Sequence, residues 1–307
     1  MPADRSPKQT LSFLLRRFAE AGIRPRTALG QNFLTDPNLQ RLLVETAQPE
    51  PNDVVLEVGT GTGSVTQLVA PRVAAVVTVE VDPAMFQLAS EELAELSRVR
   101  MLRLDALKNK NELNPEMLHA VYAELDAAPG RRFKLIANLP YVVATPVLSN
   151  LLALERPPST MTVTIQKELA DRIAAPCGTK DYGALSVWVQ SQCQARIVRL
   201  MAPSVFWPRP KVHSAIVHIE LDDQRRSRIP DLHFFHRFLR ALFSHRRKSL
   251  RSDLAQAFKG QLSKADADLI LSELGYESGL RAEQLDVDAI LALSEAVRNR
   301  TCRRTSD

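Results

Sequence analysis

The sequence predicts an α/β fold with a mostly parallel, doubly wound sheet, followed by a smaller all-helical domain. Three observations support this prediction. Short runs of β-branched residues alternate with helical stretches between residues 54 and 166, strand signals stop near residue 222, and a length of 307 residues is typical of about two domains. We therefore expect one domain at residues 1–222 and a second at residues 223–307.

Two helices are expected before the sheet. The first covers residues 10–21, where apolar side chains recur at positions 11, 14, 15 and 18 and so lie on one face of a helix. The second follows the pair Asp36-Pro37, which is typical of a helix N-cap and first helical residue, and reaches about Ala47.

Strands are expected after the breaker at residues 49–52. The five candidates are Val54–Val58, Val76–Glu80, Met101–Leu104, Lys134–Ala137 and Met161–Gln166. Two further candidates, which could form a hairpin at the edge of the sheet, are Ala195–Met201 and His213–Glu220. From residue 225 onward the pattern is helical, at Leu232–Phe243, Leu250–Phe258, Lys264–Leu274 and Val287–Val297.

Composition narrows the class of protein. No apolar run is long enough for a membrane helix, and the N-terminus lacks an apolar secretory segment. The three scattered cysteines form no C-x-x-C pair, so we expect a reduced, cytoplasmic protein with no disulfide framework and no metal site.

Positive charge is concentrated in one part of the chain. Residues 223–264 contain eleven Lys/Arg and three Asp/Glu, a net charge of +8, whereas the whole chain carries +5. The densest cluster is Arg246, Arg247, Lys248 and Arg251. Such a cluster suits the phosphates of a nucleic acid, although a solvated helix face would have the same composition.

A glycine-rich turn follows the first strand and precedes a helix. Gly59, Gly61 and Gly63 occupy its first, third and fifth positions, while the fingerprint of NAD-binding proteins requires a glycine at the sixth, where Ser64 stands. Glu80 ends the second strand, 21 residues after Gly59, where a carboxylate can bind a ribose diol. We interpret the pattern as a site for a nucleoside-bearing cofactor other than NAD, with a purely structural turn as the alternative.

Asp105 ends the third strand. Acidic side chains at the carboxyl ends of parallel strands face the crevice in which ligands bind, so Asp105 could bind an adenine amine. The alternative is that Asp105 caps the next helix.

The motif Asn138-Leu139-Pro140-Tyr141 follows the fourth strand and predicts the chemistry. An adenine amine is a poor nucleophile because its lone pair is delocalised into the ring. The Asn138 side-chain oxygen and the Leu139 carbonyl can accept hydrogen bonds from its two N–H groups and so direct the lone pair toward an electrophile. Pro140 stiffens the turn, and Tyr141 offers an aromatic face to an extruded base. A structural turn with a core tyrosine is the alternative.

Nine segments together resemble the rRNA adenine N6,N6-dimethyltransferase family, within the Rossmann-like class I S-adenosylmethionine-dependent methyltransferases. Besides the Asn138–Tyr141 motif, they are Leu29–Leu34, Leu56–Gly63, Val79–Asp82, Asp105-Ala106, Ile165–Glu168, Tyr182–Val187, Phe206–Ser214 and Phe243–Leu254. The resemblance covers most of the chain, from about residue 29 to residue 283. It implies a seven-stranded, mostly parallel sheet and a helical C-terminal domain.

The resemblance also implies a cofactor, a substrate and individual roles. S-adenosyl-L-methionine would contact Asn32, Leu34, Gly59, Glu80, Asp105 and Asn138. Phe206 would hold the target base opposite Tyr141, unless it is an ordinary core aromatic. The implied reaction is dimethylation of two adjacent adenosines in a 3′-terminal hairpin loop of small-subunit (16S) rRNA, in 30S-type particles during small-subunit biogenesis. The enzyme would act as a monomer, with the basic cluster on rRNA phosphates.

Three other functions share features of this sequence. Methyltransferases of the macrolide-resistance type modify large-subunit rRNA through nearly the same motifs, and a non-catalytic ribosome-assembly factor could keep the fold. A NAD-dependent oxidoreductase is excluded by the glycine spacing and by the lack of a catalytic dyad. Three features differ from the family pattern: Val142 stands where asparagine is common, the family's polar residue near Ser252 is altered, and residues 108–132 are long enough to suggest a surface insertion.

Overall fold

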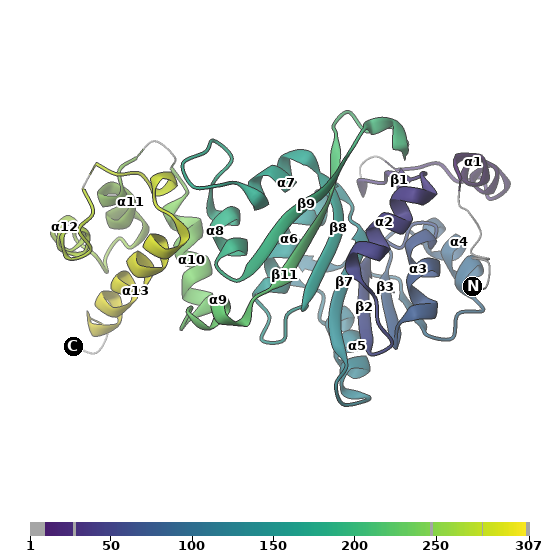
Figure 1. Ribbon diagram of the computed structural model, residues 1–307, viewed down its shortest axis with the longest axis horizontal. Coiled ribbons are helices and arrows are strands. Elements are labelled where there is room, and N and C mark those ends of the chain that lie inside the picture. The colour runs from purple at the N-terminus through teal and green to yellow at the C-terminus, as the bar shows by residue number, and fades with distance from the viewer. Residues whose placement is uncertain (1–9, 27–28, 246–247, 278, 305–307) are drawn as a thin grey trace. The chain divides into compact units, whose positions relative to one another are not determined.

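The computed structural model describes residues 10–26, 29–245, 248–277 and 279–304, which form two compact units (Figure 1). The first unit is Met1–Ala170 with Arg196–Glu220, and the second is Asp171–Ala195 with Leu221–Asp307. The sequence predicts a single boundary after residue 222. The segment Asp171–Ala195 nevertheless groups with the second unit, because Trp188 of α8 (Ala184–Gln190) stacks on His236 of α10 (Leu232–Leu242) with ring centroids 4.5 Å apart.

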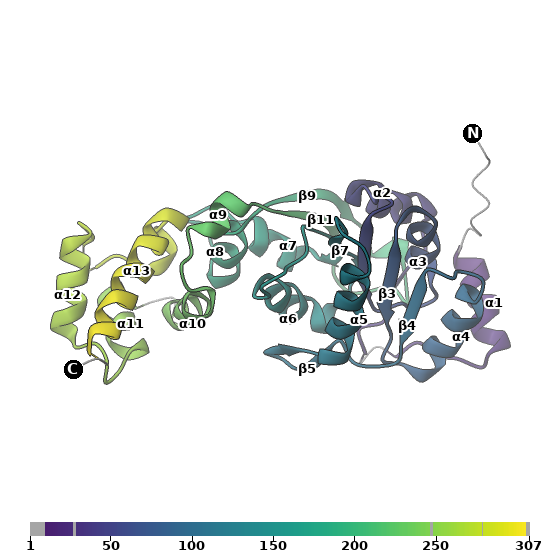
Figure 2. The ribbon, with the colours of Figure 1, turned by 90° about the horizontal axis from the view of Figure 1, so that it is seen from below.

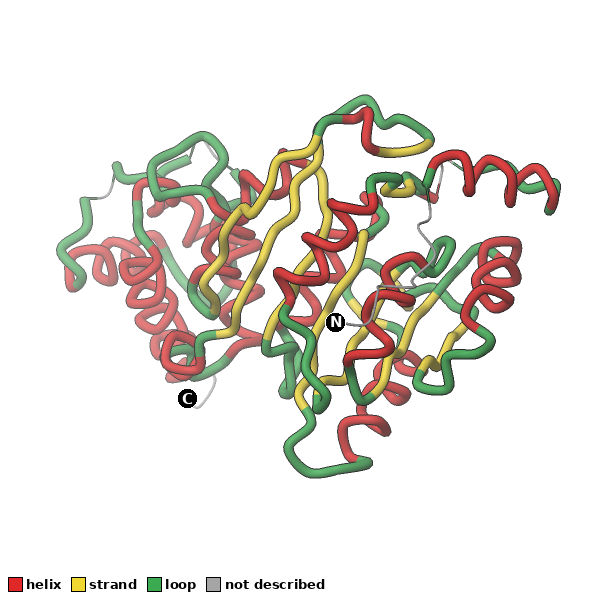
Figure 3. The backbone as a smooth tube through the Cα atoms, turned by 45° about the vertical axis from the view of Figure 1, so that its right-hand side comes forward, coloured by secondary structure: helices red, strands yellow, loops and turns green. Residues whose placement is uncertain are grey.

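The first unit is built on a seven-stranded sheet, as predicted. Its strand order is β4 (Val99–Leu102), β3 (Ala75–Val79), β2 (Asp53–Val58), β7 (Arg132–Asn138), β8 (Thr160–Gln166), β11 (Ser214–Leu221) and β9 (Cys193–Met201). The first five strands are parallel, and β11 is antiparallel to β8. Figure 3 shows these strands side by side with helices on both faces.

Helices cover both faces of this sheet (Figure 2). One face carries α2 (Pro37–Ala47) and α3 (Ser64–Val69), and the other carries α5 (Pro115–Asp126) and α6 (Tyr141–Leu152). All six residues of β2 are buried, as expected for a central parallel strand covered on two sides. Helix α4 (Pro83–Leu93) follows β3, and α7 (Lys167–Ala174) follows β8.

The expectation of a surface insertion at residues 108–132 is wrong. The segment forms a short hairpin, β5 (Leu107–Asn109) and β6 (Glu112–Leu113), and then α5. Helix α5 buries Met117, Ala120 and Val121 and packs against β2, β3 and β7. It is therefore a crossover helix of the kind that parallel strands require, and only the hairpin lies outside the sheet's layers.

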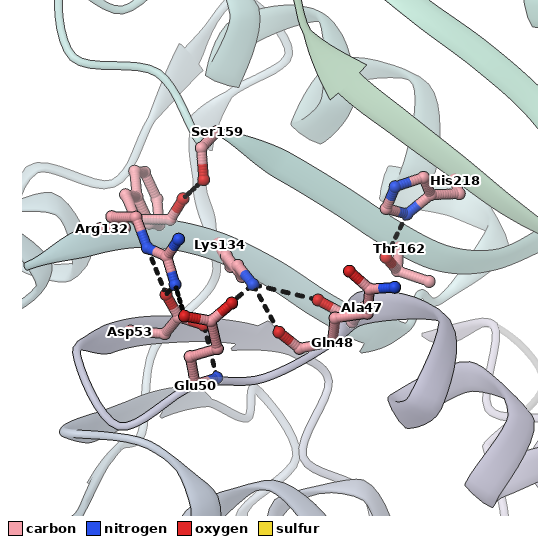
Figure 4. A network of polar contacts seen from close by, with 10 residues as sticks. Ala47, Gln48, Glu50, Asp53, Arg132, Lys134, Ser159, Thr162 and His218 are labelled. Atoms are coloured by element: carbon pink, nitrogen blue, oxygen red, sulfur yellow. Dashed lines mark hydrogen bonds and ion pairs between the residues drawn. The ribbon is translucent and has the colours of Figure 1, made fainter.

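A buried charged cluster ties the amino ends of β2 and β7 to the end of α2 (Figure 4). The Lys134 Nζ lies 2.9 Å from the Asp53 carboxylate and donates hydrogen bonds to the carbonyls of Ala47 and Gln48. Arg132 binds the other Asp53 oxygen at 3.0 Å. Asp53 and Lys134 are both buried, and each charge is compensated by its partner, so this cluster is structural.

The N-terminal residues are attached by aromatic packing and a two-stranded ribbon. Strand β1 (Phe33–Leu34) pairs with β10 (Phe206–Trp207), and α1 (Leu11–Glu20) packs on this ribbon. Phe18 of α1 meets Phe33 and Trp207 edge to face, with ring centroids 5.3 and 5.1 Å apart. Segment 29–34 is thereby fixed beside the glycine turn.

The second unit is mainly helical, and its described residues after residue 222 form helices and loops without a strand, as predicted. Besides α8 and α10 it contains α9 (Asp223–Ser227), α11 (Leu250–Ala257), α12 (Lys264–Glu273) and α13 (Val287–Arg304). Its core joins apolar side chains of α8, α10, α11 and α13, among them Phe235, Phe238 and Leu254. Across the described segments of both units, no helix combines the length and apolarity needed to cross a membrane.

Candidate active site

A cavity opens at the carboxyl ends of four neighbouring parallel strands, β4, β3, β2 and β7. The strand order reverses at β2, with β3 on one side and β7 on the other, and ligands bind at such switch points. The predicted site residues that line the cavity are Asn32, Leu34, Gly59, Glu80, Asp105, Asn138, Leu139, Pro140 and Tyr141. These residues come from five separate segments of the chain, so the fold brings together what the sequence separates.

Gly59 allows the glycine turn to meet the Asn138–Tyr141 motif. Its φ is +84°, and a Cβ at this position would lie 2.9 Å from the Pro140 ring. A side chain would therefore clash as well as strain the backbone. Gly30, with φ +68°, also lets the segment before β1 approach the motif closely: a Cβ there would lie 3.2 Å from the Tyr141 nitrogen.

Glu80 is buried beside the glycine turn. One of its carboxylate oxygens accepts a hydrogen bond from the Gly61 N–H and the other from the Asp82 N–H, each at 2.9 Å. Burial raises the pKa of Glu80, and these backbone donors oppose that shift by stabilising the charged form. Each oxygen keeps a lone pair for a further donor, which fits the two hydroxyls of a ribose.

Asp105 lies at the exposed end of the cavity. Its Oδ1 accepts a hydrogen bond from the Leu107 N–H at 2.9 Å, and the next element is strand β5. The alternative of a helix cap is therefore wrong. No described residue places a donor on the second oxygen, and the apolar side chains of Val81 and Leu104 line the cavity nearby. A hydrogen-bond acceptor beside an apolar surface suits an adenine ring, so Asp105 and its surroundings fit a nucleoside-bearing cofactor.

Glu57 is a cavity-lining acid that the sequence analysis missed. It lies on β2, is 2% exposed, and accepts hydrogen bonds from the Thr66 and Thr78 hydroxyls. Burial raises its pKa to about 7, although both hydroxyls act in the opposite direction. A charged residue inside the otherwise apolar run Val54–Val58 was the signal that could have revealed it.

Replacing Glu57 by glutamine should remove a pH dependence of stability. A folded-state pKa raised from 4.5 to about 7 means that the native protein binds an extra proton between these values. Stability from this group is fully present below pH 4.5 and is lost as the pH rises through about 7. Between pH 5 and 8 the unfolding free energy of the wild type should therefore fall by about 2–3 kcal/mol relative to Glu57→Gln. Urea unfolding of both proteins across this range measures it, and parallel pH profiles would contradict it.

The Asn138 side chain is held with its oxygen available. Its Nδ2 donates to the Asn32 carbonyl at 2.9 Å, and because a carbonyl can only accept, this contact fixes the orientation of the amide. Within the described chain, no donor is placed on the Asn138 Oδ1 or on the Leu139 carbonyl. The Leu139 side chain is buried and its N–H binds the Thr164 carbonyl, which fixes the turn. Two acceptors are thus open at the carboxyl end of β7.

Tyr141 is the first residue of α6 and lines the cavity. It is half-buried, so the alternative of a core tyrosine does not describe it. Its phenol oxygen lies 2.6 Å from the Ser214 Oγ. Burial raises the pKa of Tyr141, so the phenol is neutral near pH 7 and its role is not that of a charged base.

Phe206 does not reach the cavity. It is 3% exposed and lies in the core between the sheet and α2, with Leu43 and Ile136 among its neighbours. Its strand β10 pairs with β1, which sets Phe206 opposite Leu34. The structure thus places Phe206 as a core aromatic, the alternative given above, because the ribbon turns this side chain toward apolar neighbours.

Gln31 is a further cavity residue without an assigned role in the sequence analysis. Its Nε2 donates to the Asp82 carboxylate at 3.3 Å, and its Oε1 accepts from the Arg26 N–H at 2.7 Å. The Asp82 carboxylate also caps α4. These bonds join the segment before β1 to the end of β3. No local pattern reveals them, because the partners are 51 residues apart.

The basic cluster lies partly outside the described residues, since Arg246 and Arg247 belong to the segment that the structure does not describe. Lys248 donates to the Gln256 side chain. Arg251 forms a bidentate ion pair with Asp268, with nitrogen–oxygen distances of 2.6 and 2.8 Å. These hydrogen bonds raise the pKa of Arg251. Asp268 thus holds two of the five N–H groups of Arg251, and three remain for other acceptors.

Comparison with known proteins gives consistent matches over most of the chain. Residues 22–293 match the family of ribosomal RNA adenine dimethylases. A ribosomal RNA small subunit methyltransferase A from Geobacillus kaustophilus is 35% identical over 277 residues, which are 90% of this chain and 92% of that protein. The protein of the same name from Pediococcus pentosaceus is 37% identical and covers 87% of each chain.

Solved structures share the fold. A dimethyladenosine transferase from Plasmodium falciparum superposes with a TM-score of 0.72 at 22% identity, covering 87% of this chain and 98% of that one. The 23S rRNA methyltransferase ErmE superposes with a TM-score of 0.58, also at 22% identity, covering 87% and 99%.

Proposed function

The chain belongs to the ribosomal RNA adenine dimethylase family, and on this basis we propose that it dimethylates the N6 amine of two adjacent adenosines in a 3′-terminal hairpin loop of small-subunit (16S) rRNA. S-adenosyl-L-methionine is the methyl donor. The observation that carries the proposal is the pair of open acceptors on Asn138 and Leu139, adjoining the glycine turn of the cofactor cavity. The enzyme acts as a cytoplasmic monomer on 30S-type particles during small-subunit biogenesis.

One set of cavity residues binds the cofactor, and the Asn138–Tyr141 motif binds the target base. Glu80 binds the ribose hydroxyls and Asp105 the adenine amine, while Asn32, Leu34 and Gly59 shape the cavity around the rest of the cofactor. When bound, the cofactor supplies an electrophilic methyl group.

The Asn138–Tyr141 motif prepares the nucleophile. In the first methyl transfer, the Asn138 Oδ1 and the Leu139 carbonyl accept hydrogen bonds from the two N–H groups of the target amine, which draws the nitrogen toward tetrahedral geometry and orients its lone pair. The monomethylated amine retains one N–H, which one of the two acceptors binds in the second transfer. Both acceptors are fixed before substrate arrives, so the reaction requires no reorganisation of this turn. Tyr141 contacts one face of the extruded base.

Two observations favour small-subunit rRNA over the alternatives. Relatives that are 34–37% identical over most of their length carry the small-subunit name. The intact acceptor turn and cofactor cavity favour an enzyme over a non-catalytic assembly factor. Incubation of unmethylated 30S and 50S particles with the protein and S-adenosylmethionine, followed by mass spectrometry of the nucleosides, tests both choices. Dimethyladenosine in 30S rRNA alone is expected, and methylation confined to 50S particles would contradict the proposal.

Glu80→Ala should weaken cofactor binding. The substitution removes the charged acceptor for two ribose hydroxyls, and a loss of about 1.5–3 kcal/mol in binding free energy is expected. Calorimetric titration with S-adenosylmethionine measures it. Glu116→Ala, at an exposed acid of α5 outside the cavity, is the matched control and should keep the wild-type affinity. Unchanged affinity in folded Glu80→Ala would show that Glu80 does not bind the ribose.

Neutralising Arg246, Arg247, Lys248 and Arg251 should weaken rRNA binding without changing cofactor affinity. If all four contact phosphates, the slope of log affinity against log salt should fall by about 3–4. Asp268→Asn is the matched control, because it frees Arg251 from its ion pair and should strengthen binding. Filter-binding titrations with 30S particles at several salt concentrations measure both. An unchanged slope would identify the cluster as a solvated surface.

A further inference from the structure

The last residue of the Phe206–Ser214 motif contacts the active site, although the first does not. Ser214 is the first residue of β11, is fully buried, and lies opposite Gln166 of β8 in the sheet register. Its Oγ is 2.6 Å from the phenol oxygen of Tyr141. In the described part of the chain, this is the single hydrogen-bond partner of the Ser214 hydroxyl.

Tyr141 needs such an anchor to present a fixed aromatic face. It lies at the first turn of α6, beside the cavity, and its side chain is half-buried rather than enclosed. A ring on the edge of a cavity can rotate unless its far end is held. The sheet holds it here, because Ser214 belongs to a strand that is paired along its length with β8.

We propose that Ser214 is a positioning residue for base recognition, which fixes the Tyr141 ring through the hydrogen bond between their hydroxyls. This inference rests on the proposed function, since it assigns Ser214 to the same reaction. Ser214 touches neither the cofactor cavity nor the transferred group and acts only through Tyr141.

A double-mutant cycle of Ser214→Ala and Tyr141→Phe tests the proposal. Each single variant keeps the aromatic ring but frees it, so single-turnover methylation of 30S particles should slow by roughly 3- to 30-fold, less than for Tyr141→Ala, which removes the stacking face. The double variant should be no slower than the single ones, because both delete the same bond. The affinity for S-adenosylmethionine should stay at the wild-type value throughout.

The thermal stability of the variants distinguishes a positioning role of Ser214 from a purely structural one. Ser214→Ala leaves the Tyr141 phenol without its partner and Tyr141→Phe leaves the buried Ser214 hydroxyl without its partner, whereas the double substitution leaves neither group, so thermal stability should partly recover in the double variant. Activity should not recover. If the Ser214 hydroxyl had only a structural role, stability and activity would recover together in the double variant. Ser191→Ala is the matched control, because Ser191 is a buried serine of the second unit that binds the Trp188 carbonyl, and its loss should leave methylation unchanged.

The outcomes are distinguishable. Methylation by Ser214→Ala at the wild-type rate, or losses that multiply in the double variant, would overturn the assignment of Ser214. If Ser214→Ala fails to fold, Tyr141→Phe alone gives the same test, and a wild-type rate for that variant overturns the proposal. Failure of the wild-type protein to methylate 30S particles would instead overturn the proposed function.

Discussion

Asn138→Ala is expected to slow methyl transfer by about 100- to 1000-fold, comparable to the loss of one preorganised hydrogen-bonding group in other active sites. The substitution deletes the Oδ1 acceptor that shapes the amine nitrogen, and no neighbouring side chain replaces it. It also frees the Asn32 carbonyl, which the Asn138 amide binds at 2.9 Å. Single-turnover methylation of 30S particles at saturating S-adenosylmethionine measures the effect.

Binding alone cannot account for a loss of this size. Asn138 also lines the cofactor cavity, but a neutral hydrogen bond contributes only about 0.5–1.5 kcal/mol, so cofactor affinity should fall by about tenfold at most. Asn150→Ala, an asparagine substitution further along α6, is the matched control and should methylate normally. If Asn138→Ala kept more than a tenth of the wild-type rate, the amide would not be the acceptor that activates the amine.

Phe206→Ala is expected to lower the free energy of unfolding by about 3–5 kcal/mol, as for other aromatic side chains removed from a core. Phe206 is 3% exposed and packs among apolar residues of α2 and the sheet, so its truncation leaves a cavity there. Urea and thermal unfolding measure the loss. The resemblance instead implies a stacking role, and if Phe206 had that role the substitution would cost roughly 1–3 kcal/mol in kcat/KM.

Phe206→Leu distinguishes these two roles. Leucine keeps most of the apolar volume, so the stability cost should stay below about 1.5 kcal/mol, but it offers no aromatic face. From its burial we expect this variant to methylate at nearly the wild-type rate, which would leave Tyr141 as the aromatic contact to the base. A rate that falls as far as in Tyr141→Ala would show that Phe206 reaches the base after all.

The sequence by itself determined the parallel sheet, the cofactor cavity and the acceptor turn. Gly59, Glu80, Asp105 and Asn138 could be assigned to one site because each follows a strand signal, and the carboxyl ends of parallel strands meet at one edge of a sheet. Strand ends are local features of the chain. The chemistry at each of them is carried by one side chain or one short turn, so it can be recognised without knowing its neighbours.

Only the tertiary structure decided how these groups are supported. The Asn32 carbonyl that orients Asn138 is 106 residues away in sequence, and the Ser214 hydroxyl that holds Tyr141 is 73 residues away. The burial of Phe206 depends on the pairing of β10 with β1, and the raised pKa of Glu57 depends on its enclosure by the surrounding core. Orientation, burial and protonation are properties of contacts between distant segments, which composition, periodicity and spacing along a single chain do not contain.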